Sequence, residues 1–468
     1  MNIAERLRRY PIFEIVSKVA DDNDIICFAI GGFVRDVILS REVYDIDIVC
    51  LSRGLFLAEK VAKQVGAPNI AVYRSFGTAM FMYDGLKIEF VQARKESYNH
   101  NSRNPIVQEG TFEDDQLRRD FTINTLAVGL NKSNFGEVVN YLHGLEDLEK
   151  KIIRTPVDPD ITFSDDPLRM LRAIRFASQL HFTIDVNTFE GIKRQCERIK
   201  IIKHERIRDE INKILLSVKP SIGFNLLSKT GLLSLILPEI EALKGKERIN
   251  NLSHKDIFLH TLQVLDNVAE KSDNLWLRWT ALLHDIAKPY TKRFDPVCGF
   301  SFHGHEEIGA RWVDRIFTRL FIQKDKIPYV EKLIRLHLRP IIIAQDVVTD
   351  SAVRRLAYEA GGDFNDLMIL CRADITSKNP EKIDMYLKNF DKVEKKVEDI
   401  EKKDHIRNLQ PVITGIDIMQ ELKLSPGPIV GEIKSKLKAA IINGEIENDY
   451  EQLHVLMLKI YKQVKKNS

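Results

Sequence analysis

Two neighbouring stretches decide the fold of this 468-residue chain: residues 29–36, Ala-Ile-Gly-Gly-Phe-Val-Arg-Asp, and residues 44–49, Tyr-Asp-Ile-Asp-Ile-Val. The apolar run from Ile25 to Ile30 predicts a buried strand. Gly31 and Gly32 end that run, because glycine lets the backbone turn sharply and leaves N–H groups uncovered. The first stretch therefore predicts a strand followed by a tight turn.

A short helix is expected from Phe33 to Leu39, directly after the turn. N–H groups at a helix start bind phosphate well, and Arg35 adds a positive charge. On the next strand, Asp45 and Asp47 share one face because residues two apart point the same way. Adjacent carboxylates repel each other unless a cation joins them, and oxygen ligands suit Mg²⁺. The pattern predicts a phosphate cradle beside a two-metal site for nucleotidyl transfer.

A third carboxylate belongs to a predicted hairpin. Residues 79–83 and 87–91 are expected to be its strands, with Asp84-Gly85 at the turn. Glu89 faces away from its apolar neighbours and is a candidate partner of the two aspartates. A solvent-facing strand glutamate is the alternative.

The Gly-Gly-x-Val-Arg-Asp motif followed by Asp-x-Asp resembles the active-site opening of the polymerase-β-like nucleotidyltransferases. Within that group it resembles the bacterial class II family, which contains CCA-adding tRNA nucleotidyltransferases and poly(A) polymerases, in the form with an HD domain and closest to that of Bacteroidota. The resemblance implies an α+β fold: a small head with a mixed sheet and helices, then a largely all-α neck, HD domain and tail. It also implies that Asp45, Asp47 and Glu89 are catalytic and bind Mg²⁺.

The polar segment from Ser97 to Asp115 predicts a long mobile loop, which the resemblance identifies as the loop that helps the site switch nucleotides. Arg118-Arg-Asp-Phe-Thr-Ile-Asn124 follows. Its arginines can bind triphosphate and Asp120 can accept from a ribose hydroxyl. Such a charged cluster alone is usually a solvated face, but the match to a family motif favours nucleotide binding. The nucleotide-binding residues implied so far are Gly31, Gly32, Arg35, Arg118, Arg119, Asp120 and Asn124.

The stretch Asp165-Asp-Pro-Leu-Arg-Met-Leu-Arg-Ala-Ile-Arg-Phe176 opens the neck. Asp166 followed by proline is a good helix start, and Met170, Ile174 and Ala177 are expected to face a core, with the arginines on another face. Asp166 and Arg169 are neighbours three residues apart. One carboxylate and one guanidinium can match the edges of cytosine and adenine and reject uracil and guanine. The resemblance implies that this is the protein template for base selection; its residues are Asp165, Asp166, Arg169, Arg172 and Arg175. The family usually has Glu where Asp165 stands, which leaves the role of Asp165 open.

A second chemistry is indicated by His260, His284-Asp285 and Asp374. Imidazole and carboxylate together suit a divalent metal. A lone histidine on an apolar helix is more often a core residue, but the whole series resembles the HD-type metal-dependent phosphohydrolases. The metal would be Mn²⁺, Ni²⁺ or Mg²⁺. His303 and His305 are candidates for a second metal or a substrate phosphate, and for His337 a structural role fits at least as well.

The composition is that of an ordinary globular protein, with 44% hydrophobic and 29% charged residues and a formal charge of +3. A nucleic-acid partner must therefore be argued from local basic patches. Five cysteines without a CxxC pair argue against a zinc ribbon or disulfide framework and predict a cytoplasmic protein. No signal peptide or membrane span is expected. The predicted domains are 1–158 (head), 159–245 (tRNA-binding neck), 246–390 (HD domain) and 391–468 (RNA-binding tail).

The resemblance as a whole implies that the chain adds C, C and A to the 3′ end of tRNA, with CTP and ATP as substrates and the tRNA acceptor end as partner. A poly(A) polymerase, or an enzyme that adds only C or only A, is the alternative within the family. An alternative from another class is an HD phosphohydrolase with the head as an RNA-binding module. The sequence does not predict the oligomeric state or the HD substrate.

Overall fold

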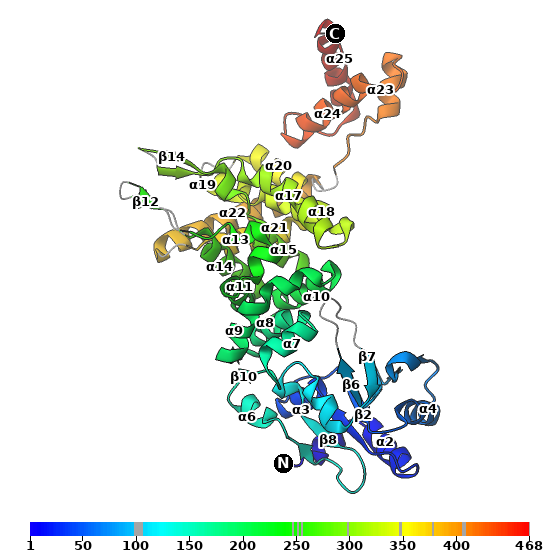
Figure 1. The fold of residues 1–468 in the computed structure, drawn as a ribbon. Coiled ribbons are helices and arrows are strands. Elements are labelled where there is room, and N and C mark those ends of the chain that lie inside the picture. Colours follow the sequence, from blue (N-terminus) through cyan, green and yellow to red (C-terminus); the bar gives the residue numbers. More distant parts are fainter. Residues whose placement is uncertain are drawn as a thin grey trace. The chain divides into compact units, whose positions relative to one another are not determined.

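The computed structural model describes residues 1–97, 106–245, 248–249, 252–253, 256–296, 299–345, 349–376, 379–404 and 409–467. Contacts divide the chain into two compact units, Met1–Pro238 and Glu239–Ser468. In Figure 1 the large sheet belongs to the blue-to-cyan start of the chain, and the green-to-red remainder is mostly helical. This confirms the predicted α+β class. The finer domain boundaries stay predictions.

The head is built on one seven-stranded mixed sheet with the strand order β3-β4-β5-β2-β1-β8-β9. Its strands are β1 (Cys27–Ile30), β2 (Asp45–Cys50), β3 (Ile70–Tyr73), β4 (Thr78–Tyr83), β5 (Leu86–Gln92), β8 (Ala127–Gly129) and β9 (Val138–Val139). β2 and β5 are parallel, and the other neighbouring pairs are antiparallel. The predicted hairpin is present, with Asp84 and Gly85 both at positive φ, as a tight hairpin turn requires.

Helices cover this sheet where the sequence supplies apolar faces. They are α1 (Ala4–Leu7), α2 (Ile12–Asp21), α3 (Gly32–Ile38) and α4 (Gly54–Gln64). α3 contacts β1 and β2, while α4 packs on β4 and β5. Pro11 directly precedes α2, a position where its missing N–H costs nothing. The strand, turn and short helix expected at the start of the motif are all present.

The segment from Ser97 to Asp115 is not one long loop. β6 (Arg94–Ser97) pairs with β7 (Ile106–Glu109), and α5 (Phe112–Leu117) follows. Thr111 and Asp114 form a capping box that fixes the start of α5. Local hydrogen bonding therefore overrides the polar composition on which the loop prediction rested. Residues 98–105 lie outside the described residues.

The neck is helical and follows two short connecting elements. The connecting elements are α6 (Gly144–Glu149) and β10 (Ile152–Ile153). The neck's own elements are α7 (Pro159–Asp165), α8 (Leu168–Leu180), β11 (Thr183–Ile184), α9 (Val186–Gln195), α10 (His204–Leu215), α11 (Pro220–Lys229) and α12 (Leu232–Ile236). α8 packs against α10 and α11. Met170, Ile174 and Ala177 are fully buried, so the predicted core face is correct.

The second unit consists almost entirely of helices. They are α14 (Ile257–Ala269), α15 (Leu275–Leu283), α16 (Lys288–Thr291), α17 (His305–Arg319), α18 (Ile327–Leu336), α19 (Arg339–Gln345), α20 (Asp350–Ala360), α21 (Phe364–Asp374), α22 (Pro380–Asp404), α23 (Gly415–Leu422), α24 (Pro428–Ile442) and α25 (Tyr450–Asn467). β14 (Arg293–Asp295) and β15 (Gly299–Ser301) form a small hairpin. In the described part of the chain, no helix combines the length and apolar character needed to cross a membrane.

Candidate active site and metal centre

Three carboxylates meet on one face of the head sheet. In the parallel pair β2–β5, Asp47 lies opposite Glu89 and Asp45 lies opposite Lys87. Paired residues of adjacent strands point to the same face, and Ile46 and Ile48 between them are fully buried on the other. Lys87 Nζ donates to Glu89 Oε2 at 2.8 Å. The sheet register thus brings together the aspartates and the glutamate that the sequence proposed.

The charge state of Asp47 reflects this crowding. Burial raises the pKa of the Asp47 carboxyl, and Arg119 opposes that rise while Glu89 and Asp45 add to it. A cation bound among these oxygens would relieve both the repulsion and the burial cost. Oxygen donors of this kind fit a hard divalent ion such as Mg²⁺.

Gly31 lets the backbone pass close to the carboxylates. Its φ of +78° lies in a region that L side chains rarely adopt. A Cβ atom at Gly31 would lie 3.1 Å from Arg119 Nη1 and 3.6 Å from Asp47 Oδ2. The glycine therefore keeps open the space between a guanidinium and a carboxylate.

A cavity of about 320 Å³ opens beside the turn. The predicted site residues that line it are Gly31, Gly32, Arg35, Asp45, Asp47, Arg119, Asp120, Asn124, Arg172 and Arg175. The lining residues that sequence reasoning missed are Phe33, Asp36, Glu42, Val43, Tyr44 and Phe176. Glu89, Arg118, Asp165, Asp166 and Arg169 are not part of this lining. The structure therefore gathers most of the predicted nucleotide-binding residues around one cavity.

A buried aspartate holds the two arginines of the central motif. Asp115 accepts hydrogen bonds from Arg118 Nε at 2.9 Å and from Arg119 Nη2 at 3.0 Å, and its side chain is fully buried. Burial raises the pKa of the Asp115 carboxyl, but the two guanidinium groups lower it by more, so the net pKa lies below the usual value. Asp115 is not among the residues predicted from the sequence, although its spacing of three and four residues from the two arginines is a signal for such ion pairs.

Asp120 connects the head to the neck helix α8. Its Oδ2 accepts from Arg172 Nε at 2.7 Å, and its Oδ1 accepts from Asn124 Nδ2 at 2.9 Å. Asn124 Oδ1 in turn accepts from Arg35 Nη1 at 2.7 Å. Burial raises the pKa of Asp120, yet Arg172 and Asn124 lower it more, so the net pKa lies well below the usual range. Both carboxylate oxygens of Asp120 already have protein partners, so Asp120 positions the arginines of this site.

Arg169 and Arg175 of α8 are buried and Arg172 is half-buried, and all three have protein partners, so they do not form a solvated face. Arg169 Nη2 donates to the carbonyl of Arg118 at 2.5 Å. Arg175 forms an ion pair of 3.1 Å with the buried Glu210, and burial lowers its pKa to about 10. At the start of the helix, Asp166 Oδ1 accepts from the N–H of Leu168 at 3.1 Å, so Asp166 caps it as predicted.

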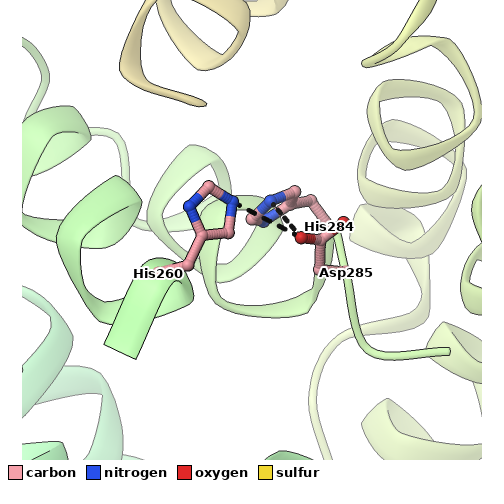
Figure 2. Close-up of side chains that lie close together, drawn as sticks. All are labelled: His260, His284 and Asp285. Carbon is pink, nitrogen blue, oxygen red and sulfur yellow. Dashed lines mark ion pairs between the residues drawn. The ribbon is translucent and has the colours of Figure 1, made fainter. Parts of the chain in front are cut away.

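The second unit gathers its own cluster of imidazole and carboxylate groups. His260 Nε2 lies 2.9 Å from Asp374 Oδ1 and 3.5 Å from Asp285 Oδ2. His284 Nε2 lies 3.3 Å from Asp285 Oδ2 and 3.6 Å from Asp374 Oδ1. Figure 2 shows His260 and His284 pointing toward the Asp285 carboxylate. The four residues predicted from the sequence converge from α14, α21 and the end of α15.

Two further histidines reach Asp285 from its other side. Its Oδ1 lies 3.3 Å from His305 Nε2 and 3.8 Å from His337 Nε2. His303 does not join them: its side chain is exposed and belongs to neither candidate metal group found among the described residues. His337 is fully buried, and the sequence alone gave no preference for a place in this cluster.

The cluster fits a divalent metal ion. Nδ1 of His284 lies 2.8 Å from the carbonyl of Ala281. A carbonyl oxygen can only accept a hydrogen bond, so Nδ1 carries the hydrogen. In the neutral ring, Nε2 then has a lone pair that can bind a metal. Burial lowers the pKa of His284, but Asp285 and Asp374 raise it to about 10. The two carboxylates therefore stabilise a positive charge at this position. Either a proton or a metal ion can supply that positive charge.

Comparison with known families matches four consecutive regions. They are the poly A polymerase head domain at residues 27–154, the probable RNA and SrmB-binding site of polymerase A at 181–244, the HD domain at 257–379 and the putative tRNA nucleotidyltransferase domain 2 at 362–456. The regions follow the order that the sequence predicted.

Relatives match over long stretches. An A-adding tRNA nucleotidyltransferase of Deinococcus radiodurans is 30% identical over 353 residues, which cover 73% of this chain and 77% of the relative. A CCA-adding enzyme of Pediococcus pentosaceus is 27% identical over 436 residues, 92% of each protein. The crystal structure of the Bacillus stearothermophilus CCA-adding enzyme in complex with CTP superposes with a TM-score of 0.68 at 21% identity, covering 97% of this chain and 98% of that one. That likeness concerns the fold.

The fold, the carboxylate face and the relatives together define an enzyme of the nucleotidyltransferase class that also carries an HD domain. The chain belongs to the bacterial class II tRNA nucleotidyltransferase and poly(A) polymerase family. The family resemblance inferred from the sequence is confirmed.

Proposed function

We propose that this protein adds C, C and A to the 3′ end of tRNA, with CTP and ATP as substrates. The observation that carries the proposal is the register of β2 and β5, which places Asp47 opposite Glu89. Asp47 and Asp45, two residues before it on the same strand, line a cavity that arginines also line. CCA-adding relatives match over 90–92% of this chain and a CC-adding relative over 90% of it, so addition to defined tRNA ends is the measurement that separates full from partial addition. The cytoplasm, where tRNA matures, is the proposed location.

Asp45, Asp47 and Glu89 are the proposed ligands of the catalytic cations, with Mg²⁺ as the metal. Bound there, two such ions would supply Lewis acidity at the attacking 3′-hydroxyl and at the leaving pyrophosphate. The protein's own contribution is positioning. Gly31 and Gly32 let a triphosphate approach the backbone, while Arg35 and Arg119 face its charge from the cavity wall.

The neck supplies base selection in this proposal. Asp166 and Arg169 are the proposed template for cytosine and adenine, since their acceptor and donor groups match those base edges. Arg169 donates to the carbonyl of Arg118, within the motif that also provides the cavity's Arg119. Base selection is thereby tied to triphosphate binding. Asp165, the last residue of α7, adjoins this template in sequence.

The acceptor arm of tRNA is proposed to lie against the helical neck and tail through phosphate contacts that read no sequence. In the tail, α24 carries Lys434, Lys436 and Lys438. Lys436 is held by Glu432 at 2.8 Å, and Lys438 lies 4.7 Å from the ring centroid of Tyr358. Lys434 is thus the member of this group best suited to a phosphate.

The direct test uses tRNA transcripts that end before the CCA, after C and after CC, with labelled CTP or ATP and Mg²⁺. Ordered addition that stops after the terminal A supports the proposal. Unlimited A addition identifies a poly(A) polymerase, and addition of only C or only A identifies a partial enzyme. A protein that adds nothing to any transcript contradicts the nucleotidyltransferase proposal itself.

A second function is favoured by the buried histidine–aspartate cluster. His260, His284, Asp285 and Asp374 are the proposed ligands of a divalent ion, with Mn²⁺, Ni²⁺ and Mg²⁺ as candidates, for hydrolysis of phosphate esters on RNA or nucleotides. Asp374→Ala should abolish both the metal content of this domain and any phosphatase activity, while leaving nucleotide addition intact. Unchanged metal content in that variant contradicts the ligand set.

A further inference from the structure

The aromatic ring of Phe176 faces three guanidinium groups. Their Cζ atoms lie 4.1 Å from the ring centroid for Arg175, 4.9 Å for Arg35 and 5.5 Å for Arg172. Arg35 belongs to helix α3 of the head, whereas Phe176 and the other two arginines belong to helix α8 of the neck. All four side chains line the cavity beside the carboxylates. Phe176 is therefore a common contact of arginines that come from two separate parts of the site.

The three guanidinium groups repel one another at this spacing. Burial lowers the pKa of Arg175 to about 10, and the charges of Arg172 and Arg35 contribute to the lowering. Each guanidinium has a carboxylate partner of its own: the pairs are Arg35 with Asp36, Arg172 with Asp120 and Arg175 with Glu210. These carboxylates stand on different elements, so each holds one arginine without joining the three. The ring of Phe176 is a contact that all three arginines share.

An aromatic ring suits this position for a physical reason. The face of the ring carries a partial negative charge and attracts cations, most strongly when the groups are out of water. Phe176 is 6% exposed, so its ring is in such a place. Because the ring has no formal charge, it offsets the repulsion among the guanidinium groups without adding a carboxylate that would repel a triphosphate.

A second aromatic ring fixes the orientation of the first. The ring centroids of Phe121 and Phe176 lie 5.9 Å apart, and the ring planes are at 85° to each other, an edge-to-face arrangement. Phe121 is fully buried, and its N–H donates to Asp120 Oδ1 at 2.9 Å. The ring of Phe176 is thus packed against the same head motif that pairs with Arg172.

We propose that Phe176 is a positioning residue for the incoming nucleotide, and that its ring holds Arg35, Arg172 and Arg175 together at the cavity where the nucleotide binds. The inference rests on the nucleotide addition proposed above and deepens it. A phenylalanine that only fills the core would contribute its volume. A phenylalanine that positions arginines also contributes the charge distribution of its ring, and this second contribution can be measured separately.

The test changes the charge distribution of the ring and nearly preserves its shape. In the full chain, Phe176 is replaced with pentafluorophenylalanine, because the fluorine atoms reverse the partial charge on the ring face. We expect KM for CTP and for ATP to rise about 10-fold, with kcat and the Kd for tRNA close to those of the wild type. Calorimetric titration with CTP or ATP in the absence of tRNA should show the same loss as a higher Kd.

Two further variants separate this effect from a loss of packing. Phe176→Leu removes the ring but keeps an apolar side chain, and it should raise both KM values as well. Phe224 of helix α11 is the matched control, because it is a fully buried ring of the neck outside the cavity lining. Its replacement with pentafluorophenylalanine should leave both KM values unchanged. Circular dichroism verifies that each protein is folded, and the fluorinated protein decides the question if Phe176→Leu unfolds.

The outcomes separate this inference from nucleotide addition itself. Wild-type KM and Kd values for both nucleotides in the protein fluorinated at Phe176 contradict the inference, because packing alone does not depend on the sign of the ring charge. An equal rise on fluorination of Phe224 contradicts it too. A wild type that binds CTP and ATP but adds neither contradicts nucleotide addition alone, and the calorimetric Kd then decides the role of Phe176. A wild type that binds neither nucleotide contradicts both proposals.

Discussion

Asp120 of the head accepts a hydrogen bond from Nε of Arg172 on neck helix α8 at 2.7 Å; the Asp120 side chain is buried and that of Arg172 is half-buried. The pair ties the nucleotide-binding motif to the helix proposed to select the base. Asp120 also accepts a hydrogen bond from Asn124, and Asn124 in turn accepts one from Arg35. A change at this joint should therefore affect both stability and nucleotide binding.

Arg172→Gln tests that joint. The loss of the guanidinium leaves the Asp120 carboxylate buried without its charge partner, which costs roughly 3 kcal/mol in the free energy of unfolding. KM for CTP and ATP should rise as Arg35 loses its ordered partner. Urea unfolding and steady-state kinetics measure the two effects. Arg194→Gln, which removes a pair with Asp160 on the surface of the neck, is the control and should change both quantities little.

The same pair gives a pH dependence of known sign. The folded pKa of Asp120 lies below its unfolded value of about 4. A carboxyl of this kind stabilises the fold fully above the unfolded pKa and loses that contribution as the pH falls toward the folded pKa. The stability gap between the wild type and Arg172→Gln should be constant from about pH 7 to pH 5 and shrink below about pH 4. A gap that widens in acid contradicts this assignment.

Gly31→Ala should abolish most of the nucleotidyl transfer. The new Cβ would press on Arg119 at 3.1 Å and fill the space up to contact with Asp47, and the positive φ would be strained. A misplacement of about 1 Å near reacting groups can lower kcat about 100-fold, so the smaller shift expected here, together with the backbone strain, should lower kcat by roughly 10-fold or more. Gly66→Ala is a matched control, because Gly66 has a φ of +67° but nothing within 4 Å of the added atom. Equal losses of activity in both variants would mean that strain alone matters, and not the space beside Asp47.

Lys87→Met should lower the Mg²⁺ concentration needed for half-maximal activity several-fold. The ammonium group of Lys87 competes with a metal for Glu89, and its charge also acts on Asp45 and Asp47. Mg²⁺ titrations of the transfer rate measure the change. Lys60→Met on helix α4 is the control and should leave the titration unchanged. A higher Mg²⁺ requirement in Lys87→Met would show that the lysine supports the metal site.

Arg169→Ala should relax base selection. The guanidinium is the proposed donor to the cytosine carbonyl and ring nitrogen, and a lost hydrogen bond to a charged group is worth about 1.5–3 kcal/mol. The preference for CTP over UTP, as a ratio of kcat/KM values, should fall roughly 10- to 100-fold. Unchanged discrimination would remove Arg169 from the template.

The sequence predicted the central part of the head because local signals there are strong. The glycine turn, the Asp-x-Asp strand and the Asp84-Gly85 hairpin each follow from short-range chemistry. The pairing of β2 with β5 does not, so the opposition of Asp47 and Glu89 is visible only in the sheet register. The capping box of Thr111 and Asp114 was a readable signal for α5 that the polar composition masked.

The neck and the HD cluster show a different limit. From the sequence alone, Arg172 and Arg175 would be placed on a solvent-exposed face of α8, because their partners Asp120 and Glu210 are distant along the chain. His337 likewise sits in an apolar helix, where a core histidine is the ordinary expectation. Only the packing of α18 near the end of α15 brings it to Asp285.

The most direct test of the central claim compares Asp47→Asn with Asp84→Asn in nucleotide addition and in tRNA binding. Asp84 lies in the hairpin turn at positive φ, a conformation that asparagine tolerates. Asp47→Asn should eliminate addition of CTP and ATP while the Kd for tRNA stays unchanged, because the carboxylate serves the metal and not the RNA. Asp84→Asn should be fully active. Addition at the wild-type rate by Asp47→Asn would contradict the assignment of the active site.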